Sequence, residues 1–184
     1  NNTELWLDAT YRAPAACVSH GHGDHIRKHH LAFATKPTAS FMRRRLGKME
    51  LKEVAFDEPF EYAGAQITFV PAGHILGSAQ ILVEVEGQRL LYTGDFNTEQ
   101  GRTAETVGYP KCDILVTETT FGHPRYRFPE RSNVEDALCQ FCQSALDEGF
   151  HPVIFAYTLG KAQEAKKVLS REGFKLCVHG SILH

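Results

Sequence analysis

Long apolar runs are absent from this sequence of 184 residues. A helix that spans a bilayer needs roughly 20 consecutive, mostly apolar residues, and no stretch approaches that length. Residues 1–3 also lack the basic start and the following apolar segment that mark an export signal. The sequence therefore predicts a protein without a membrane span that stays in the cytoplasm.

The sequence also carries little excess charge, since 20 Lys and Arg residues stand against 22 Asp and Glu residues, giving a formal net charge of −2. This balance excludes a highly basic protein that coats nucleic acid. The five cysteines are an odd number scattered along the chain, unlike the paired framework of small secreted proteins. The content of 42% hydrophobic and 23% charged residues is ordinary globular usage, which excludes a disordered chain.

The first half of the chain predicts short strands separated by turns. The expected strands cover residues 4–9, 16–19, 65–70, 79–86, 88–93 and 112–117. One helix interrupts them over 38–46, with Thr38 as a residue of the N-cap type and Gly47 at its end.

From Ser132 onward the pattern changes. Ser132 and Glu135 have the spacing of a capping box and predict a helix that ends at Gly149. A strand over 152–157, a helix over 160–172 and a strand over 174–178 follow, which is the order of a βαβ unit with a parallel pair. We therefore expect two domains, over 1–120 and 121–184.

The most informative segment is the loop Ser-His-Gly-His-Gly-Asp-His at 19–25. Imidazole nitrogens and carboxylate oxygens are common zinc ligands, and the two glycines permit a tight loop. We expect His20 and His22 to face one ion, and Asp24 and His25 to face a second. A His-rich surface turn is the alternative interpretation.

Two more segments each follow a predicted strand and carry a single residue of a metal-ligand type. In each segment a glycine stands directly before that residue. They are Pro-Ala-Gly-His-Ile-Leu-Gly-Ser at 71–78, which offers His74, and Tyr-Thr-Gly-Asp-Phe at 92–96, which offers Asp95. Alone, a His or Asp in such a turn usually makes only hydrogen bonds. With the loop at 19–25, His74 completes a site of three histidines, and Asp95 is a carboxylate able to bridge two ions.

This constellation resembles the metallo-β-lactamase superfamily, in which HxHxDH, a later His and a later Asp build a site for two metals at the edge of an αββα sandwich. The resemblance implies an α+β fold of that kind and two zinc ions, with manganese as the alternative because the same ligands accept both. Asp8, in Leu-Trp-Leu-Asp-Ala, matches an early acidic residue that supports a metal ligand in the nuclease branches. An ordinary turn Asp is the other interpretation.

Two further stretches resemble the β-CASP group of nucleic-acid-processing nucleases. They are Pro-Ala-Gly-His-Ile-Leu-Gly-Ser-Ala-Gln at 71–80 and Thr-Glu-Thr-Thr-Phe-Gly at 117–122, where Glu118 takes the acidic position of the first cap motif. Arg-Tyr-Arg-Phe-Pro at 125–129 and the segment 155–163 are most similar to the bacterial ligase-associated DNA exonucleases. The resemblance implies a metallo-β-lactamase core over 1–120 and the start of an inserted cap domain over 121–184.

The group closes its second metal site with a His far downstream. His179 and His184 do not lie in that sequence context, so we expect the chain to be a fragment without this last ligand. The resemblance implies a metal-dependent phosphodiesterase, chiefly a DNA repair exonuclease, with DNA ligase and repair proteins as candidate partners. Two ions about 3.5 to 4 Å apart lower the pKa of a shared water toward about 7, and the resulting hydroxide attacks phosphorus. Asp24 would orient this nucleophile, Glu118 would relay protons, and Asp8 would support the site.

The substrate side of the prediction is DNA or RNA, contacted by Arg125, Tyr126, Arg127 and Lys161. Basic side chains neutralise phosphates and aromatic side chains stack on bases, while a helix that begins at Lys161 aims backbone N–H groups at a phosphate. The basic run 43–45 is either a second such patch or a solvated helix face. A solvated loop and an ordinary helix start are the alternatives for the other segments.

Three other functions remain open on the sequence alone. The first is an RNA-processing nuclease of the same group, with either exonucleolytic or endonucleolytic attack. The second is a thioesterase or lactonase of the superfamily that applies the same metals to a carbonyl. The third is an inactive scaffold subunit, which the six intact ligand positions disfavour.

Overall fold

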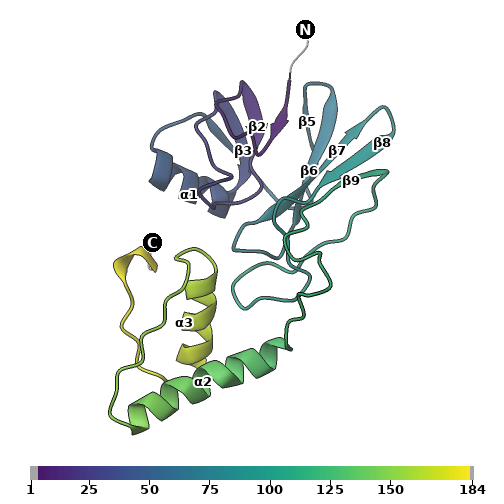
Figure 1. Ribbon diagram of the computed structural model, residues 1–184. Coiled ribbons are helices and arrows are strands. Elements are labelled where there is room, and N and C mark those ends of the chain that lie inside the picture. Colours follow the sequence, from purple (N-terminus) through teal and green to yellow (C-terminus); the bar gives the residue numbers. More distant parts are fainter. Residues whose placement is uncertain (1–3, 183–184) are drawn as a thin grey trace. The chain divides into compact units, whose positions relative to one another are not determined.

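Figure 1 shows the arrangement of strands and helices in the computed structural model, which describes residues 4–182. His184 lies outside the described residues. The chain divides into two compact units, Asn1–Glu118 and Thr119–His184. Within residues 4–182 the fold is α+β, with two sheets and three α-helices, which is compatible with an α/β sandwich. Both sheets belong to the first unit.

The first sheet is parallel and follows the chain order β1-β2-β3-β4. Its strands are β1 (Trp6–Leu7), β2 (Ala15–Cys17), β3 (Leu31–Thr35) and β4 (Leu51–Val54). Strands β2 and β3 are runs of small or apolar residues and are almost wholly buried, as expected for parallel strands covered on both faces. Helix α1 (Lys36–Leu46) makes the crossover from β3 to β4 and buries Thr38, Ala39 and Met42.

The second sheet is mostly antiparallel, in the order β5-β6-β7-β8-β9. Its strands are β5 (Phe60–Tyr62), β6 (Ala65–Pro71), β7 (Ala79–Val85), β8 (Gln88–Tyr92) and β9 (Ile114–Val116), of which β9 runs parallel to β8. Two-residue turns at 63–64 and 86–87 join β5 to β6 and β7 to β8. All four turn residues have positive φ, as tight hairpin turns demand.

The core of the first unit lies between the two sheets. Cys17 and Phe33 of the parallel sheet pack against Ile67, Phe69 and Ile81 of the other sheet. A second buried cluster, between α1 and the parallel sheet, contains Val18, Ile26, Ala32, Ala34, Ala39 and Met42. The unit is therefore layered as helix, sheet and sheet, and burial of each large apolar side chain contributes about 1.5 to 3 kcal/mol.

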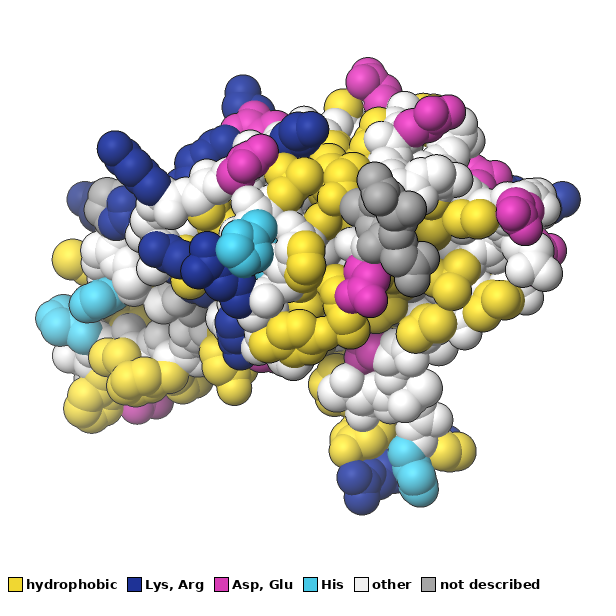
Figure 2. Space-filling view, turned by 90° about the horizontal axis from the view of Figure 1, so that it is seen from above, with side chains coloured by type: hydrophobic (Ala, Val, Ile, Leu, Met, Phe, Trp, Pro, Cys, Tyr) yellow, Lys and Arg dark blue, Asp and Glu magenta, His cyan; other side chains and the backbone are white. Residues whose placement is uncertain are grey.

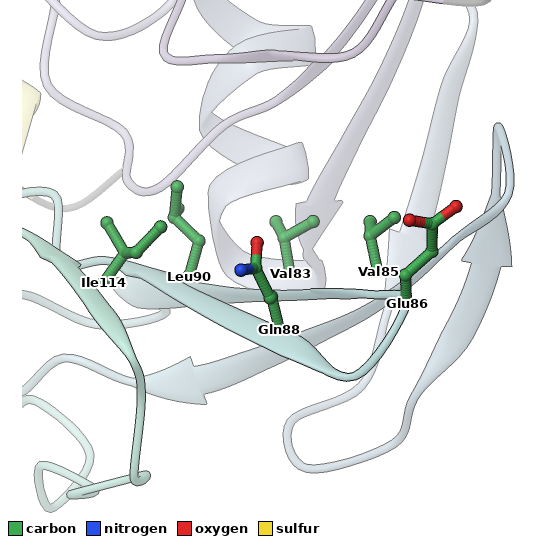
Figure 3. A pocket seen from close by; sticks show the side chains of 6 residues that line it. All are labelled: Val83, Val85, Glu86, Gln88, Leu90 and Ile114. Atoms are coloured by element: carbon green, nitrogen blue, oxygen red, sulfur yellow. The ribbon is translucent and has the colours of Figure 1, made fainter.

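The inner face of the antiparallel sheet continues beyond this core. Val83, Val85, Leu90 and Ile114 project from it and line a shallow apolar hollow, with Glu86 and Gln88 at its rim (Figure 3). Val83 and Val85 share a face with the buried Ile81 because side chains alternate along a strand. Val85 is 44% exposed and Ile114 is 48% exposed, so no strand of the parallel sheet within residues 4–118 covers this end.

The second unit contains α2 (Arg131–Asp147), α3 (Lys161–Arg171) and a short 3-10 helix (Gly180–Ile182). Ion pairs join the two long helices, because Arg131 lies 3.0 Å from Glu164 and Arg171 lies 3.7 Å from the buried Glu135. No helix within residues 4–182 is both long enough and apolar enough to cross a membrane.

Three expectations for the second unit are wrong. The segments 152–157 and 174–178 are not strands within the described part of this unit, so the βαβ unit is not formed. Phe155 is 94% exposed and Tyr157 is 80% exposed, and a strand is stable only when a neighbour pairs with it. Helix α2 begins at Arg131 with Glu130 at its N-cap and no side-chain capping bond, so Ser132 does not start a capping box.

In the first unit every expected strand has a counterpart, but β3, β4 and β5 were not expected. Helix α1 begins at Lys36 after Thr35, two residues before the expected start. Thr38 is therefore not the N-cap. It is buried in the first turn, and its hydroxyl donates a hydrogen bond to the backbone oxygen of Gly77 at 3.0 Å.

Candidate metal centre

The loop after β2 carries four of the expected ligands. The backbone N–H groups of His25 and Ile26 both donate to the backbone oxygen of His22 at 3.2 Å, which closes one tight turn. Arg45, at the end of α1, donates to the backbone oxygen of Gly21 at 2.9 Å. Arg45 therefore supports the ligand loop, a role that the sequence did not indicate for the basic run 43–45.

The loop between β6 and β7 presents His74. Ser78 holds this loop, because its hydroxyl accepts hydrogen bonds from the N–H groups of His74 at 3.0 Å and Ile75 at 3.2 Å. Gly73 has a φ of 72°, and a Cβ atom at this position would lie 2.4 Å from the backbone oxygen of Asn97. A larger residue at position 73 would therefore displace the loop that carries His74.

The loop after β8 presents Asp95. The preceding Gly94 has a φ of 54°, and a Cβ atom there would lie 2.7 Å from the side chain of Ser19. Because glycine has no side chain, the Asp95 loop can approach the segment after β2 that carries Ser19 and His20. Residues from both sheets meet at this point.

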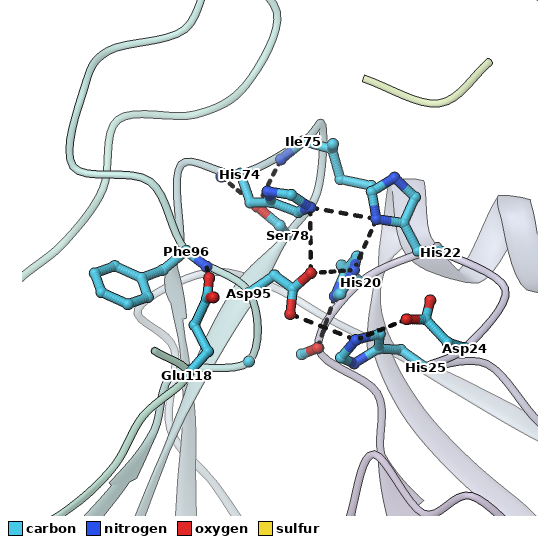
Figure 4. A network of polar contacts seen from close by, with 12 residues as sticks. His20, His22, Asp24, His25, His74, Ile75, Ser78, Asp95, Phe96 and Glu118 are labelled. Atoms are coloured by element: carbon cyan, nitrogen blue, oxygen red, sulfur yellow. Dashed lines mark hydrogen bonds and ion pairs between the residues drawn. The ribbon is translucent and has the colours of Figure 1, made fainter. Parts of the chain in front are cut away.

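Three histidines and Asp95 form the first cluster of donor atoms (Figure 4). His22 Nδ1 lies 3.0 Å from His20 Nε2 and 3.2 Å from His74 Nε2. Asp95 Oδ2 lies 3.6 Å from the Nε2 atoms of both His20 and His74. Zinc bonds of 2.0 to 2.2 Å in a tetrahedron place ligand atoms about 3.3 Å apart, so this donor set fits such an ion.

A second group of donor atoms, from Asp8, His20 and His25, lies on the other side of Asp95, and Asp24 belongs to neither group. His25 Nε2 is 3.4 Å from Asp95 Oδ1 and 3.7 Å from Asp24 Oδ2. The two oxygens of Asp95 therefore face different clusters, the arrangement that a bridging carboxylate requires. The side chain of Asp24 is 80% exposed and lies at the solvent side of the centre.

Asp8 orients His25 directly and His20 through Ser19 by hydrogen bonds. Its side chain is 4% exposed and accepts hydrogen bonds from Ser19 N at 2.7 Å, from the Ser19 hydroxyl and from His25 Nδ1 at 2.8 Å. The Ser19 hydroxyl also lies 2.9 Å from His20 Nδ1. Because the Nδ1 atoms of His20 and His25 are occupied in this way, both rings turn Nε2 toward the donor clusters.

The electrostatics of the centre suit a cation. Burial lowers the pKa of His20 to about 2, helped by the three neighbouring histidines, so its ring is neutral as metal binding requires. Burial also lowers the pKa of His25, but the hydrogen bond and charge of Asp8, together with the charges of Asp95 and Asp24, raise that pKa overall. Burial raises the pKa of Asp95, and the charges of Glu118 and Asp24 add to this effect.

Glu118 lies beside this centre in the first unit. Its Oε1 accepts a hydrogen bond from the backbone N–H of Phe96 at 3.3 Å, next to Asp95 (Figure 4). The carboxylate is half-buried and close enough to influence the pKa of Asp95. The structure thus places Glu118 near the donor clusters but outside both of them.

The expected nucleic-acid residues lie in the second unit. The guanidinium of Arg125 lies 4.7 Å from the centre of the Tyr126 ring and donates to its hydroxyl at 2.7 Å. Phe121 contacts Tyr126 and Phe128 edge to face, with ring centres 5.3 and 5.1 Å apart. Phe128, like Tyr126, was expected as an aromatic interleaved with the arginines, whereas the contact of Phe121 with both rings was not expected.

Lys161 is exposed at the first position of α3. The side chain of Gln163 already accepts a hydrogen bond from the backbone N–H of Gly160 at 2.8 Å, at the start of this helix. This contact is that of an ordinary helix start.

His29 is expected to make the stability of the first unit depend on pH. Its ring is 2% exposed, Nδ1 accepts a hydrogen bond from Ala13 N at 3.2 Å, and Nε2 is buried without a partner. Burial lowers the pKa of His29 from its usual 6.5. The unfolded chain therefore binds this proton more readily, and stability is lost as the pH falls below about 6.5.

We expect His29→Asn to reduce this pH dependence, because the amide oxygen can still accept the Ala13 N–H but does not titrate. Urea unfolding of both proteins at pH 7.5 and pH 5.5, with chelator present, measures the difference. An equal loss of unfolding free energy in the two proteins would assign the effect to another group.

The chain has relatives among larger proteins. It is 38% identical over 177 residues to a probable DNA ligase of Opitutus terrae, a match that covers 95% of this chain and 17% of that protein. It is 32% identical over 203 residues to an RNase J-like protein of Methanocaldococcus jannaschii, covering 92% and 48%. The cleavage and polyadenylation specificity factor 73 of Drosophila melanogaster is 30% identical over 122 residues, covering 65% and 18%. The chain thus spans less than half the length of these relatives.

No protein-family model matches the chain. A crystal structure of a protein of unknown function from Enterococcus faecalis V583 is similar with a TM-score of 0.58 and 17% identity. The similarity covers 85% of this chain and 44% of that one. At this level of identity the likeness concerns the fold.

Proposed function

Because the chain belongs to the β-CASP nuclease group of the metallo-β-lactamase superfamily, we propose that it is the metal-binding part of a hydrolase that cleaves phosphodiester bonds in nucleic acid. The observation that carries the proposal is the convergence of His20, His22 and His74 on Asp95, with His25 on the opposite side of that carboxylate. These donors come from three loops and both sheets.

In this proposal the first unit is the amino-terminal part of a metallo-β-lactamase αββα sandwich. Helix α1 and the two sheets supply one helical layer and both sheet layers. Residues 119–182 begin the cap domain. The division of the chain after Glu118 supports this assignment.

The proposed cofactor is a pair of zinc ions, with manganese as the alternative. His20, His22 and His74 would hold the first ion, Asp24 and His25 the second, and Asp95 would touch both. Bound metal ions lower the pKa of a water and neutralise charge on a phosphate. Asp24, at the solvent side of the centre, would accept a hydrogen bond from the attacking water and orient it toward phosphorus.

The remaining carboxylates, Asp8 and Glu118, first hold other parts of the centre in place. Asp8 holds His25 through its Nδ1 proton, and Glu118 holds the Asp95 loop through the N–H of Phe96. As water attacks, the bond between phosphorus and the leaving oxygen breaks on the opposite side, and that oxygen must gain a proton. Glu118 is the proposed relay for this proton because it lies at the margin of the centre.

The proposed substrate contacts are Arg125, Tyr126, Arg127 and Lys161, with Phe121 and Phe128 beside them. On the face drawn in Figure 2, Lys and Arg side chains lie in separate groups between acidic and apolar ones, and the net charge of the whole chain is −2. Phosphate binding must therefore depend on local groups of basic residues. Arg125 and Arg127 form such a group beside exposed aromatic rings.

We expect the double variant Arg125→Ala/Arg127→Ala to bind nucleic acid more weakly and with a shallower salt dependence. Each lost phosphate contact reduces the slope of log K against log[salt] by about 0.7 to 0.9. Fluorescence anisotropy of a labelled oligonucleotide with chelator present measures the slope. The matched control is Lys166→Ala/Lys167→Ala, which removes two exposed charges from α3. Equal slopes in the two double variants would remove the arginines from the proposed interface.

Cleavage of nucleic-acid strands tests the proposed function directly. End-labelled DNA and RNA, incubated with the chain and zinc or manganese, should be cut, and chelator should block the reaction. We propose DNA repair by an exonuclease first, because the relative of highest identity described above is named as a probable DNA ligase. RNA processing is the second candidate, supported by the RNase J-like relative. Thioester hydrolysis without strand cleavage would contradict both, and binding without turnover would indicate a scaffold.

A further inference from the structure

Tyr92 links the two sheets by a hydrogen bond next to the candidate metal centre. It is the last residue of β8 and pairs with Ile81 of β7, so its ring points toward the core between the sheets. Its hydroxyl donates a hydrogen bond to Asp8 Oδ2 at 3.0 Å. Asp8 follows β1 in the parallel sheet, 84 positions earlier in the chain.

Asp8 Oδ2 receives three hydrogen bonds from different parts of the fold. The Ser19 hydroxyl and His25 Nδ1 belong to the loop after β2, whereas Tyr92 belongs to the antiparallel sheet. The loop that follows β8 of the same sheet carries Asp95, three positions after Tyr92. The Tyr92 hydroxyl therefore fixes the carboxylate that orients His25 relative to the strand end that presents Asp95.

We propose that Tyr92 is a positioning residue for the second cation, the one placed between His25, Asp24 and Asp95. This inference rests on the proposed function. Loss of the hydroxyl would let Asp8 turn toward its remaining donors and would loosen His25, whose Nε2 lies 3.4 Å from Asp95 Oδ1. The first cluster is less dependent on Asp8, because His22 and His74 are held by their own loops.

Tyr92→Phe tests this role, since it removes one hydroxyl and keeps the ring that packs on the core. Contacts of this kind change metal affinity by about 10-fold to 100-fold. We expect about a 10-fold weaker second binding event and an unchanged first one, because Asp8 keeps its other donors. Titration of the metal-free chain with Zn²⁺ against a chromophoric chelator measures both affinities. Tyr62→Phe is the matched control, as Tyr62 packs on the same core against Phe33, in β5.

The outcomes separate this inference from the proposed function. Two binding events in the wild type, with only the second weakened in Tyr92→Phe and neither weakened in Tyr62→Phe, support the positioning role. Equal affinities in wild type and Tyr92→Phe, or an equal loss at both sites, overturn it and leave the proposed function intact. One binding event in the wild type also overturns it, and a wild type that binds no metal overturns both proposals.

Discussion

Asp95→Ala is expected to abolish phosphodiester hydrolysis, by at least about 1,000-fold, without unfolding the chain. Asp95 offers one oxygen to the cluster of His20 and His74 and the other to His25. Alanine removes both contacts at once, so neither of the two proposed cations would keep its shared ligand. Initial rates on a labelled oligonucleotide at saturating metal measure this loss.

The fold should survive because the Asp95 carboxylate is unfavourable in the metal-free chain. Burial and the charges of Glu118 and Asp24 raise its pKa, which means that the folded state disfavours its ionised form. Metal-free Asp95→Ala should therefore unfold at the wild-type temperature or above it. Asp136→Ala, which removes an exposed carboxylate from α2, is the control and should keep full activity. Metal-dependent turnover in Asp95→Ala would exclude Asp95 from the centre.

Removal of metal is expected to stop hydrolysis and to destabilise the protein. Each cation held at 100 times its Kd stabilises the folded chain by about 2.7 kcal/mol. For a chain of this size that corresponds to a fall in Tm of about 5 to 10 °C per site. The physical reason is that the centre brings Asp24, Asp95 and Glu118 together, and a bound cation offsets their mutual repulsion.

Thermal unfolding and strand cleavage, both recorded with and without EDTA, measure the two effects. EDTA saturated with zinc beforehand is the control, since it cannot remove zinc from the protein. Activity should return when zinc or manganese is added in excess, and the more effective ion identifies the preferred cofactor. Full activity and an unchanged Tm in EDTA would show that hydrolysis does not depend on metal.

The convergence of donor side chains was largely predictable because the candidate ligands lie in short, glycine-containing motifs. The loop at 19–25 holds four donors within six residues, so local spacing alone places them together. His74 and Asp95 were harder to predict, because they converge only when β6, β7 and β8 pack against the parallel sheet. The contacts of Tyr92 with Asp8 and of Arg45 with Gly21 depend on tertiary packing, and no local pattern indicated them.

The errors in secondary structure also have physical causes. Strand β3 is rich in alanine and β4 carries adjacent charges, so neither has the β-branched, alternating pattern that predicts a strand. The segments 152–157 and 174–178 do have apolar composition, but a strand also needs a hydrogen-bonding neighbour. Composition predicts the tendency of a segment, whereas pairing depends on the rest of the fold.

The metal content of the purified wild-type chain tests the central claim most directly, because it assumes no substrate. Elemental analysis after mild dialysis should find about two zinc or manganese ions per chain, and fewer in Asp95→Ala measured alongside. A wild-type chain without bound metal, which takes up none when zinc is supplied, would contradict the assignment of His20, His22, His74 and Asp95 as a metal centre.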